Sequence, residues 1–414
     1  MRRGLGLALA FGLLATLLGI PASAAQLHRW TGRVTHIADG DTFDVDIAGD
    51  GTSTPKRIRL TGVQAMEIGE CHSKAAANRL EALIGGKNVR LTAQDPNSRG
   101  LHDRLVRQVE YKAGGSWRDV GIKLLAEGHA LWMPHPTEAR NHEGYNRAAS
   151  SAAAKRLRLW DTDSCAPGPQ QSARLRVWVQ WDADSNDGQN LNGEWVKLYN
   201  PGGGDLRLDG WRLRDTALRG HSYFVFPAGT VLRSGNSLTV HVGKGKNTAT
   251  RLYWGQSAPV FENAVTDGRS EYLGDGAYLF DRDGDLRWWF TYPCALRCTD
   301  RLQGKLALTT VQYDPPGEDT ALGEYVDVTN VSLARVQLYG YLLESWPYGH
   351  AFPRKSALEP GQTLRVRIGK GADKSGQQYW GLPSSVLANT GDVVQLRTFD
   401  LVRLDCHAWG QRSC

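Results

Sequence analysis

The C-terminal part of this chain contains one sequence pattern twice, and this repeat constrains the fold more than any other feature. The stretch NGEWVKLYN at 192–200 matches GEYVDVTN at 323–330, and 223–245 matches 350–371 in the same way. The copies are offset by 126 to 130 residues, far longer than a solenoid repeat, so each copy is expected to be a whole domain. Short alternating strands with glycine and proline turns predict two β-sandwiches, whose paired aromatic residues we assign to the cores.

The segment before the repeats is organised differently. Strand-like alternation is found at 33–47, 57–63 and 104–111. Helical spacing is found at 71–86, 118–130 and 144–160. The simplest assembly is a small β-barrel with helices packed around it, followed by a linker, APGPQQSA, at 166–173. The predicted fold class is therefore mainly β.

Residues 1–24 have the pattern of a secretory signal peptide. Two arginines precede an apolar run, and Ala22, Ser23 and Ala24 supply the small residues of a cleavage site. A membrane anchor is the alternative, but no stop-transfer flank follows and no later stretch is apolar enough to span a bilayer. We therefore expect an exported protein without a membrane span, either secreted, periplasmic or held at the envelope. The roughly 390 residues that remain suggest two to four domains.

The six cysteines all lie in the exported part of the chain, where an even count favours disulfides over metal ligands. We expect Cys71 and Cys165 to pair, because both fall within the first domain. The CxxxC at Cys294 and Cys298 has no partner pair at zinc spacing, so a zinc site is not expected. A formal net charge of +6 does not by itself indicate a nucleic-acid-binding protein, and any basic surface must be local.

The first domain contains the residue types that phosphodiester cleavage needs. Cations must face the phosphate oxygens, a base must take a proton from water, and a hard divalent ion can assist both. Asp41 lies in an Asp-Gly turn, Arg59 on an alternating strand, Glu67 just beyond that strand and Arg104 at the start of another. If Ile58 and Leu60 face the barrel interior, Arg59 faces outward. Taken singly, each residue has an ordinary alternative, as a hairpin turn or a solvated surface charge.

The order of these residues resembles the staphylococcal nuclease (thermonuclease) family over residues 25–165. The family pattern runs from a valine strand through Asp-Gly-Asp-Thr to an Arg-Leu strand, an acidic loop, a second arginine strand and a helix ending in Gly-x-Ala. The matching stretches here are VTHIADGDT at 34–42, RLTGVQAME at 59–67, DRLVRQV at 103–109 and LLAEGHA at 124–130. The resemblance implies an OB-fold barrel with a calcium-dependent phosphodiesterase site.

Carried over by position, the resemblance implies a role for six residues. Asp41, Gln64 and the carbonyl of Ala65 would hold one Ca²⁺. Arg59 and Arg104 would clamp the phosphate, and Glu67 would be the general base. Arg99 is a rival for the second arginine, but the spacing from Arg104 to the following strand fits the family better.

Three positions depart from the family pattern. Gln64 replaces a carboxylate ligand, Met66 a proline and Asp103 a glycine. An amide oxygen can still bind calcium, although the site loses one negative charge. We therefore expect a retuned site whose metal binding depends on substrate. The aromatic residues that stack on a nucleotide in the family have no clear match, and Trp132 is assigned to the core rather than to that role.

The repeats, at about 174–296 and 305–410, resemble lamin tail domains, an immunoglobulin-like β-sandwich. The resemblance depends on Gly-Glu-aromatic-Val, the corners LDGW and LYGY, Phe-Pro and Tyr-Trp-Gly. It implies a fold and leaves function open, with tethering or substrate approach as the expected role. The acidic loops at 182–194 and 281–285 are assigned to turn chemistry rather than to calcium binding.

We predict an exported, calcium-dependent endonuclease that acts on DNA, RNA or both, with two C-terminal modules that bind an envelope or extracellular ligand. The alternative is a non-catalytic exported protein that binds nucleic acid or a surface, with a degenerate nuclease barrel. His135 and His142 are assigned to the surface.

Overall fold

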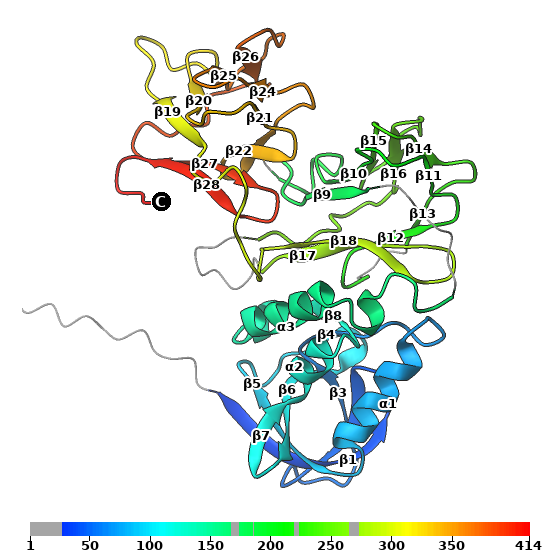
Figure 1. Ribbon diagram of the computed structural model, residues 1–414. Coiled ribbons are helices and arrows are strands. Elements are labelled where there is room, and N and C mark those ends of the chain that lie inside the picture. Colours follow the sequence, from blue (N-terminus) through cyan, green and yellow to red (C-terminus); the bar gives the residue numbers. More distant parts are fainter. Residues whose placement is uncertain (1–26, 167–173, 185, 219–222, 265–272) are drawn as a thin grey trace, which may run out of the picture.

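The structure is a computed structural model that describes residues 27–166, 174–184, 186–218, 223–264 and 273–414. The expected signal peptide and most of the expected linker lie outside these residues. The described chain forms a barrel and two sandwiches stacked in sequence order, with the first sandwich between the other two bodies (Figure 1). None of the helices in the described ranges has the length and apolar character that a membrane span requires.

The first body is a closed five-stranded barrel, as predicted. Its sheet has the order β3-β2-β1-β5-β6, and a parallel pairing of β3 with β6 closes it. A hairpin strand, β7, extends the sheet beyond β6. The strands are β1 (His28–Ile37), β2 (Thr42–Ile47), β3 (Lys56–Leu60), β5 (Asn88–Ala93), β6 (Leu105–Ala113) and β7 (Ser116–Asp119).

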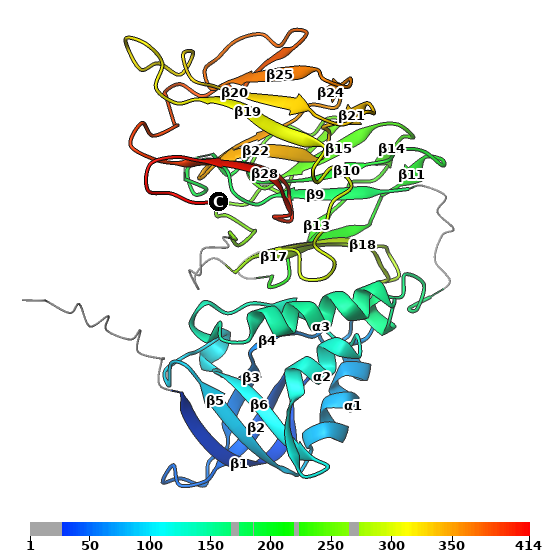
Figure 2. The ribbon, with the colours of Figure 1, turned by 60° about the vertical axis from the view of Figure 1, so that its left-hand side comes forward.

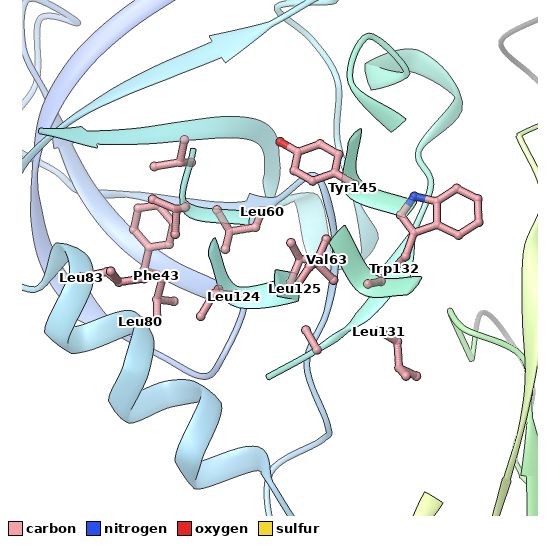
Figure 3. Close-up of a cluster of buried hydrophobic side chains, with 14 of the residues drawn as sticks. Phe43, Leu60, Val63, Leu80, Leu83, Leu124, Leu125, Leu131, Trp132 and Tyr145 are labelled. Carbon is pink, nitrogen blue, oxygen red and sulfur yellow. The ribbon is translucent and has the colours of Figure 1, made fainter. Parts of the chain in front are cut away.

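Helices and a short strand pair cover the barrel and share its apolar core. Phe43 and Leu60 point inward from the strands and meet Leu80 of the first helix and Leu124 of the second (Figure 3). Full burial of a side chain of this size contributes about 1.5–3 kcal/mol. The covering elements are α1 (Ser73–Ile84), α2 (Val120–Ala126), α3 (His142–Ala154), and the strand pair β4 (Gly62–Gln64) with β8 (Leu131–Met133).

The third helix is shorter than predicted. The sequence pattern runs to Trp160, whereas α3 ends at Ala154. Arg156 and Arg158 then adopt positive φ angles of 51° and 49°, which a continuing right-handed helix excludes. A short 3-10 turn, η3 (Arg158–Trp160), follows and buries Trp160 against Trp289 of the first sandwich.

The first repeat is a β-sandwich. One sheet has the order β16-β15-β10-β9 and the other β13-β12-β17-β18, with a short pair of strands at the edge. The strands are β9 (Arg176–Gln180), β10 (Trp195–Tyr199), β11 (Leu206–Arg207), β12 (Arg212–Arg214), β13 (Phe224–Val225), β14 (Val231–Leu232), β15 (Ser237–His241), β16 (Arg251–Tyr253), β17 (Asp275–Phe280) and β18 (Leu286–Tyr292).

The second repeat has the same strand order, so the predicted pair of sandwiches is confirmed. Its sheets are β19-β20-β25-β26 and β23-β22-β27-β28. The strands are β19 (Leu306–Gln312), β20 (Tyr325–Asn330), β21 (Val336–Gln337), β22 (Tyr341–Ser345), β23 (Tyr348–Ala351), β24 (Ala357–Leu358), β25 (Thr363–Arg367), β26 (Gln377–Tyr379), β27 (Val393–Thr398) and β28 (Arg403–Ala408).

The barrel and the first sandwich share one apolar cluster. Trp160 packs edge-on against Trp289, with ring centroids 5.1 Å apart, and lies 6.2 Å from Tyr278. Figure 2 shows α3 lying between the barrel and the sheet of β17 and β18. Both bodies bury residues of the same cluster, so the barrel and the first sandwich are packed together through an apolar core.

Three disulfides staple the chain. Cys71 pairs with Cys165, as expected, and this bond closes the first body. The other two bonds are short-range and join Cys294 to Cys298 and Cys406 to Cys414. This full pairing agrees with an oxidising environment and with the expectation that the CxxxC is no zinc site.

Candidate active site

A cavity of about 860 Å³ opens at one side of the barrel, where β3 ends and the chain crosses into β4. All six residues singled out from the sequence line this cavity. They are Asp41, Arg59, Gln64, Ala65, Glu67 and Arg104.

Asp41 is held in a tight turn between β1 and β2. Its backbone N–H donates to Asp39 Oδ1 at 2.9 Å, and its carbonyl accepts from the backbone of Leu60 at 2.9 Å. A side chain at Gly40 would collide with Ala76 and Ala65, since a Cβ there would lie 2.5 and 2.7 Å from their Cβ atoms. The glycine therefore lets the turn press against the barrel wall, which aims Asp41 inward.

Both carboxylate oxygens of Asp41 have partners. Oδ1 accepts from the hydroxyl of Thr42 at 2.9 Å and lies 3.2 Å from Arg59 Nε, and Oδ2 accepts from the backbone of Ala65 at 2.7 Å. Burial raises the pKa of Asp41 to about 6; Arg59 opposes this rise and Asp39 adds to it. A buried carboxylate whose pKa is raised in this way favours a nearby positive charge.

Arg59 is buried, which the alternation of its strand does not predict. Ile58 and Leu60 face the barrel core as expected, and Arg59 points to the other face. That face is covered, so Arg59 is only 4% exposed and donates to the carbonyls of Leu60 and Val63. The reading of Arg59 as a solvated surface residue is therefore wrong. Burial lowers its pKa, Asp41 opposes this effect, and the nearby charge of Arg104 adds to it.

Gln64 bridges the arginine and the predicted base. Its Oε1 accepts from Arg59 Nη2 at 2.7 Å, and its Nε2 donates to Glu67 Oε1 and to the carbonyl of Ala65, both at 3.0 Å. The amide oxygen has two lone pairs, so Oε1 can accept from Arg59 and still face an ion in the cavity. The structure thus adds two contacts that the sequence did not predict, one with Arg59 and one with Glu67.

Glu67 lies in the loop after β4 and is exposed to solvent. The hydrogen bond from Gln64 orients its carboxylate towards the cavity, which Glu67 lines. Its loop is closed by the backbone N–H of Glu67, which donates to Glu70 Oε2 at 3.1 Å. Glu67 therefore combines a fixed orientation with access to water.

Arg104 and its rival Arg99 both line the cavity, from opposite sides of the short turn η1 (Leu101–Asp103). Arg104 donates to the carbonyl of Leu101 at 2.9 Å and to the hydroxyl of Thr42 at 3.2 Å. Arg99 is exposed and pairs with Asp103, with 3.2 Å between Nε and Oδ1. Arg104 is therefore the one that contacts the Asp41 turn, through Thr42.

A divalent ion fits this donor set in part. Asp41, with a raised pKa, and the adjacent Asp39 both line the cavity, as does Ala65. Calcium needs six to eight oxygen ligands, so most would have to come from water or a phosphate. Within the described residues, the one group of three histidine, cysteine or acidic ligand atoms that meet within 4.8 Å is Cys71, His72 and Cys165. Those two sulfur atoms are bonded to each other, so that group is not a metal site.

Two contributions to the cavity were missed from the sequence. His135 lines it, with its Nδ1 3.1 Å from the hydroxyl of Thr137, whereas it was assigned to the surface alone. The first sandwich adds Ala217, Leu218 and Tyr223 to the cavity wall. No local sequence signal announces this second contribution, because it follows from how two domains dock.

The remaining assignments concern the core and the acidic loops. Trp132 is 1% exposed and belongs to the barrel core, so it is no stacking platform in this structure. In the loop at 182–194, Asp187 accepts from the backbone of Ala183 at 2.8 Å. Asp281 accepts from the backbones of Asp283 and Asp285, both at 3.0 Å. These are the contacts of acidic residues in turns.

Comparison with known proteins identifies the two sandwiches. A family model described as Lamin Tail Domain matches residues 177–294 and 300–410. These ranges overlap the two modules expected from the repeat and lie outside the barrel. No curated protein matches the chain.

Proposed function

The chain belongs to the lamin tail domain family through its two β-sandwiches, and we propose that its barrel is an exported, metal-dependent nuclease acting on DNA, RNA or both. The observation that carries the proposal is the common cavity of Asp41, Arg59, Glu67 and Arg104. These residues come from four separate segments of the sequence, and each provides a function that phosphodiester hydrolysis requires.

The two arginines would bind the phosphate. Arg104 lies at the mouth, partly exposed, while Arg59 lies on the buried floor. Their charges lie close enough for Arg104 to lower the pKa of Arg59, so an anion between them relieves repulsion. The same two charges would stabilise the extra negative charge that develops on the phosphate oxygens in the transition state.

Glu67 would act as the general base. Its carboxylate removes a proton from a water molecule, the water oxygen forms a bond to phosphorus, and the bond from phosphorus to one ester oxygen breaks. The leaving oxygen takes up a proton from solvent and departs as a sugar hydroxyl. The hydrogen bond from Gln64 to Glu67 keeps this base on the cavity side of its loop.

Asp41, the amide oxygen of Gln64 and the Ala65 carbonyl would hold the expected Ca²⁺, with Asp39 beside them. When bound, such an ion supplies positive charge to the phosphate and lowers the pKa of a bound water. Because Asp41 already pairs with Arg59, binding of the ion is expected to require the phosphate as a further ligand.

A second candidate function is non-catalytic binding of nucleic acid or of an envelope component. The observation that favours it is the engagement of Arg59, whose donors contact the carbonyls of Leu60 and Val63 and the oxygen of Gln64. In both proposals the two sandwiches serve as modules that hold the barrel near an envelope or extracellular ligand.

The direct test is digestion of plasmid DNA and of RNA by the purified full-length protein with Ca²⁺ and with EDTA. We expect calcium-dependent cleavage, and a loss of at least about a hundredfold in Glu67→Gln. Glu143→Gln is the matched control, since Glu143 is exposed on α3 and does not line the cavity. Binding without cleavage at any calcium concentration would support the second candidate instead.

Position 64 offers a sharper test of the ion. A carboxylate has two oxygens, so an aspartate there can accept from Arg59 with one and face the ion with the other. We expect Gln64→Asp to lower the calcium concentration that gives half the maximal cleavage rate. An unchanged calcium requirement would mean that position 64 serves only to bridge Arg59 and Glu67.

A further inference from the structure

Exposed apolar side chains surround the mouth of this otherwise polar cavity. Ile68 is 79% exposed and Leu101 is 56% exposed, although both are large aliphatic residues. Leu218, from the first sandwich, is partly exposed and lines the same cavity. We call Ile68, Leu101 and Leu218 the apolar rim. Isolated exposed leucines are ordinary, but three around one charged cavity call for a ligand with an apolar part.

Hydrogen bonds hold the rim in place from both domains. The loop that carries Ile68 is closed by the Glu70 backbone, which donates to the carbonyl of Glu67 at 2.9 Å. Glu70 Oε1 in turn accepts from the Tyr223 hydroxyl of the sandwich at 2.6 Å. Leu101 is tied to Arg104, and the backbone of Leu218 donates to Asp215 Oδ1 at 2.9 Å. The backbone that carries the rim is therefore held by hydrogen bonds in both domains.

The floor and the rim differ in chemistry. Arg59 and Asp41 on the floor are nearly inaccessible to solvent, so a phosphate that reaches them must enter the cavity. A nucleotide bound in this way carries its base towards the mouth, where the exposed side chains are aliphatic. In a duplex the base faces are stacked inside and the charged backbone is outside. Only an unpaired base has an apolar face to place against the rim.

Building on the proposed function, we propose that the apolar rim binds unpaired bases next to the phosphate on the floor. The preferred substrate is then a single strand or a frayed end, and the first lamin tail domain contributes to this choice through Leu218. The sandwich would therefore be part of the substrate site as well as a tether.

The test is binding of labelled oligonucleotides to full-length protein carrying Glu67→Gln, which keeps the strands intact. Three probes of equal length are compared by fluorescence anisotropy: a single strand, its duplex, and a single strand in which abasic sites replace the bases. The phosphate charge is the same in both single strands, so their difference in Kd reports contacts with bases. We expect the normal single strand to bind about tenfold more tightly than the abasic strand and than the duplex.

Serine substitutions assign this difference to the rim. Leu218→Ser, Leu101→Ser and Ile68→Ser are each expected to weaken binding of the normal strand by about three- to tenfold and to leave the abasic strand unchanged. Leu333→Ser is the matched control, because Leu333 is 98% exposed on the second sandwich. Equal Kd values for normal and abasic strands, or equal losses for both in the rim variants, would overturn the proposal.

The outcome for the rim can be separated from the outcome for catalysis. Base-dependent binding that the rim variants abolish, in a protein that cleaves nothing, would support the rim and reject the nuclease. Calcium-dependent cleavage with the same Kd for both single strands would support the nuclease and reject the rim.

Discussion

The two lamin tail domains have the same strand order, yet only the first contributes to the candidate active site. The difference lies in one connection. In the second domain β22 and β23 form a tight hairpin in which Ser345 pairs with Tyr348. In the first domain the equivalent strands, β12 and β13, are separated by residues 215–223, and this longer connection supplies the cavity-lining residues. One fold thus serves as a plain module in one copy and as part of a site in the other.

The two copies are alike in how they dock. In the first domain the hairpin of β17 and β18 meets the barrel, where Asp285 Oδ1 accepts from the backbones of Ser164 and Cys165 at 2.6 and 2.8 Å. In the second domain the equivalent hairpin of β27 and β28 meets the first domain. There the carbonyl of Phe399 accepts from Trp181 Nε1 at 3.0 Å, and the carbonyl of Asp400 accepts from the Cys294 backbone at 2.8 Å.

One matched pair of positions shows what docking does to a side chain. Gln180 donates to the carbonyl of Asp182, and Gln312 donates to the carbonyl of Asp314, both at 2.6 Å. Asp182 is buried near the second domain, whereas Asp314 is exposed. Burial raises the pKa of Asp182 to about 8, with Asp187 and Glu344 adding to the rise and Arg397 opposing it.

The largest effect is expected when the core shared by the barrel and the first domain is removed. Trp160→Ala deletes a ring that is 1% exposed, and we expect it to lower the free energy of unfolding by about 3–5 kcal/mol. Calorimetry is the measurement, with Trp117→Ala as the control because Trp117 is 37% exposed. If the unfolding of the first domain does not shift to lower temperature together with that of the barrel, the two bodies do not share a core.

The docking hairpin of the first domain can be tested next. Asp285→Ala leaves the backbone N–H groups of Ser164 and Cys165 without their acceptor, which we expect to cost about 2–3 kcal/mol. Asp283→Ala in the same hairpin is the control, since Asp283 is exposed. Urea denaturation measures both variants, and equal midpoints would show that the hairpin contact contributes nothing to stability.

The raised pKa of Asp182 predicts a stability that falls as pH rises, the opposite sign to the effect of a carboxyl whose pKa is lowered on folding. Below pH 4 Asp182 is protonated in both folded and unfolded chains. Between about pH 4 and pH 8 the unfolded chain loses this proton and the folded chain keeps it, so stability falls as pH rises. We expect Asp182→Asn to stabilise the chain on the order of 1–2 kcal/mol at pH 8 and by little at pH 4. Asp314→Asn is the control, and thermal melts across this range decide. A gain that does not vary with pH would exclude titration of Asp182 as its cause.

The smallest expected effect concerns the bond that holds the longer connection. Tyr223→Phe removes the hydroxyl that donates to Glu70, at a cost of about 1 kcal/mol. A double-mutant cycle with Glu70→Gln isolates this bond, because each variant also has effects of its own. A coupling energy of zero would mean that the connection is held by other contacts.

The sequence predicts much of the fold because the signals are local. Alternation predicts β3 with Ile58 and Leu60 inward, and the repeat predicts two sandwiches of similar length. The end of α3 was missed because the positive φ angles at Arg156 and Arg158 follow no residue preference for that conformation. They allow Trp160 to reach the first sandwich, which is a tertiary effect.

The candidate site was predictable in its members and not in its contacts. The resemblance to the nuclease pattern groups Asp41, Arg59, Glu67 and Arg104, and they line one cavity. The partner of Gln64 depends on the burial of Arg59, which no sequence pattern encodes. The apolar rim depends on residues more than a hundred positions apart, so only the docked domains reveal it.

The docking hairpins make the contacts between domains sequential, because in each sandwich the turn between the last two strands contacts the body that precedes it in the chain. The turn of the first sandwich binds the barrel through Asp285, and the turn of the second binds the first sandwich through Phe399. Deletion of the second sandwich would remove no residue of the contact between the first sandwich and the barrel. Deletion of the first sandwich, by contrast, would uncover Trp160 of the barrel and would leave the Phe399 turn of the second sandwich without its Trp181 partner.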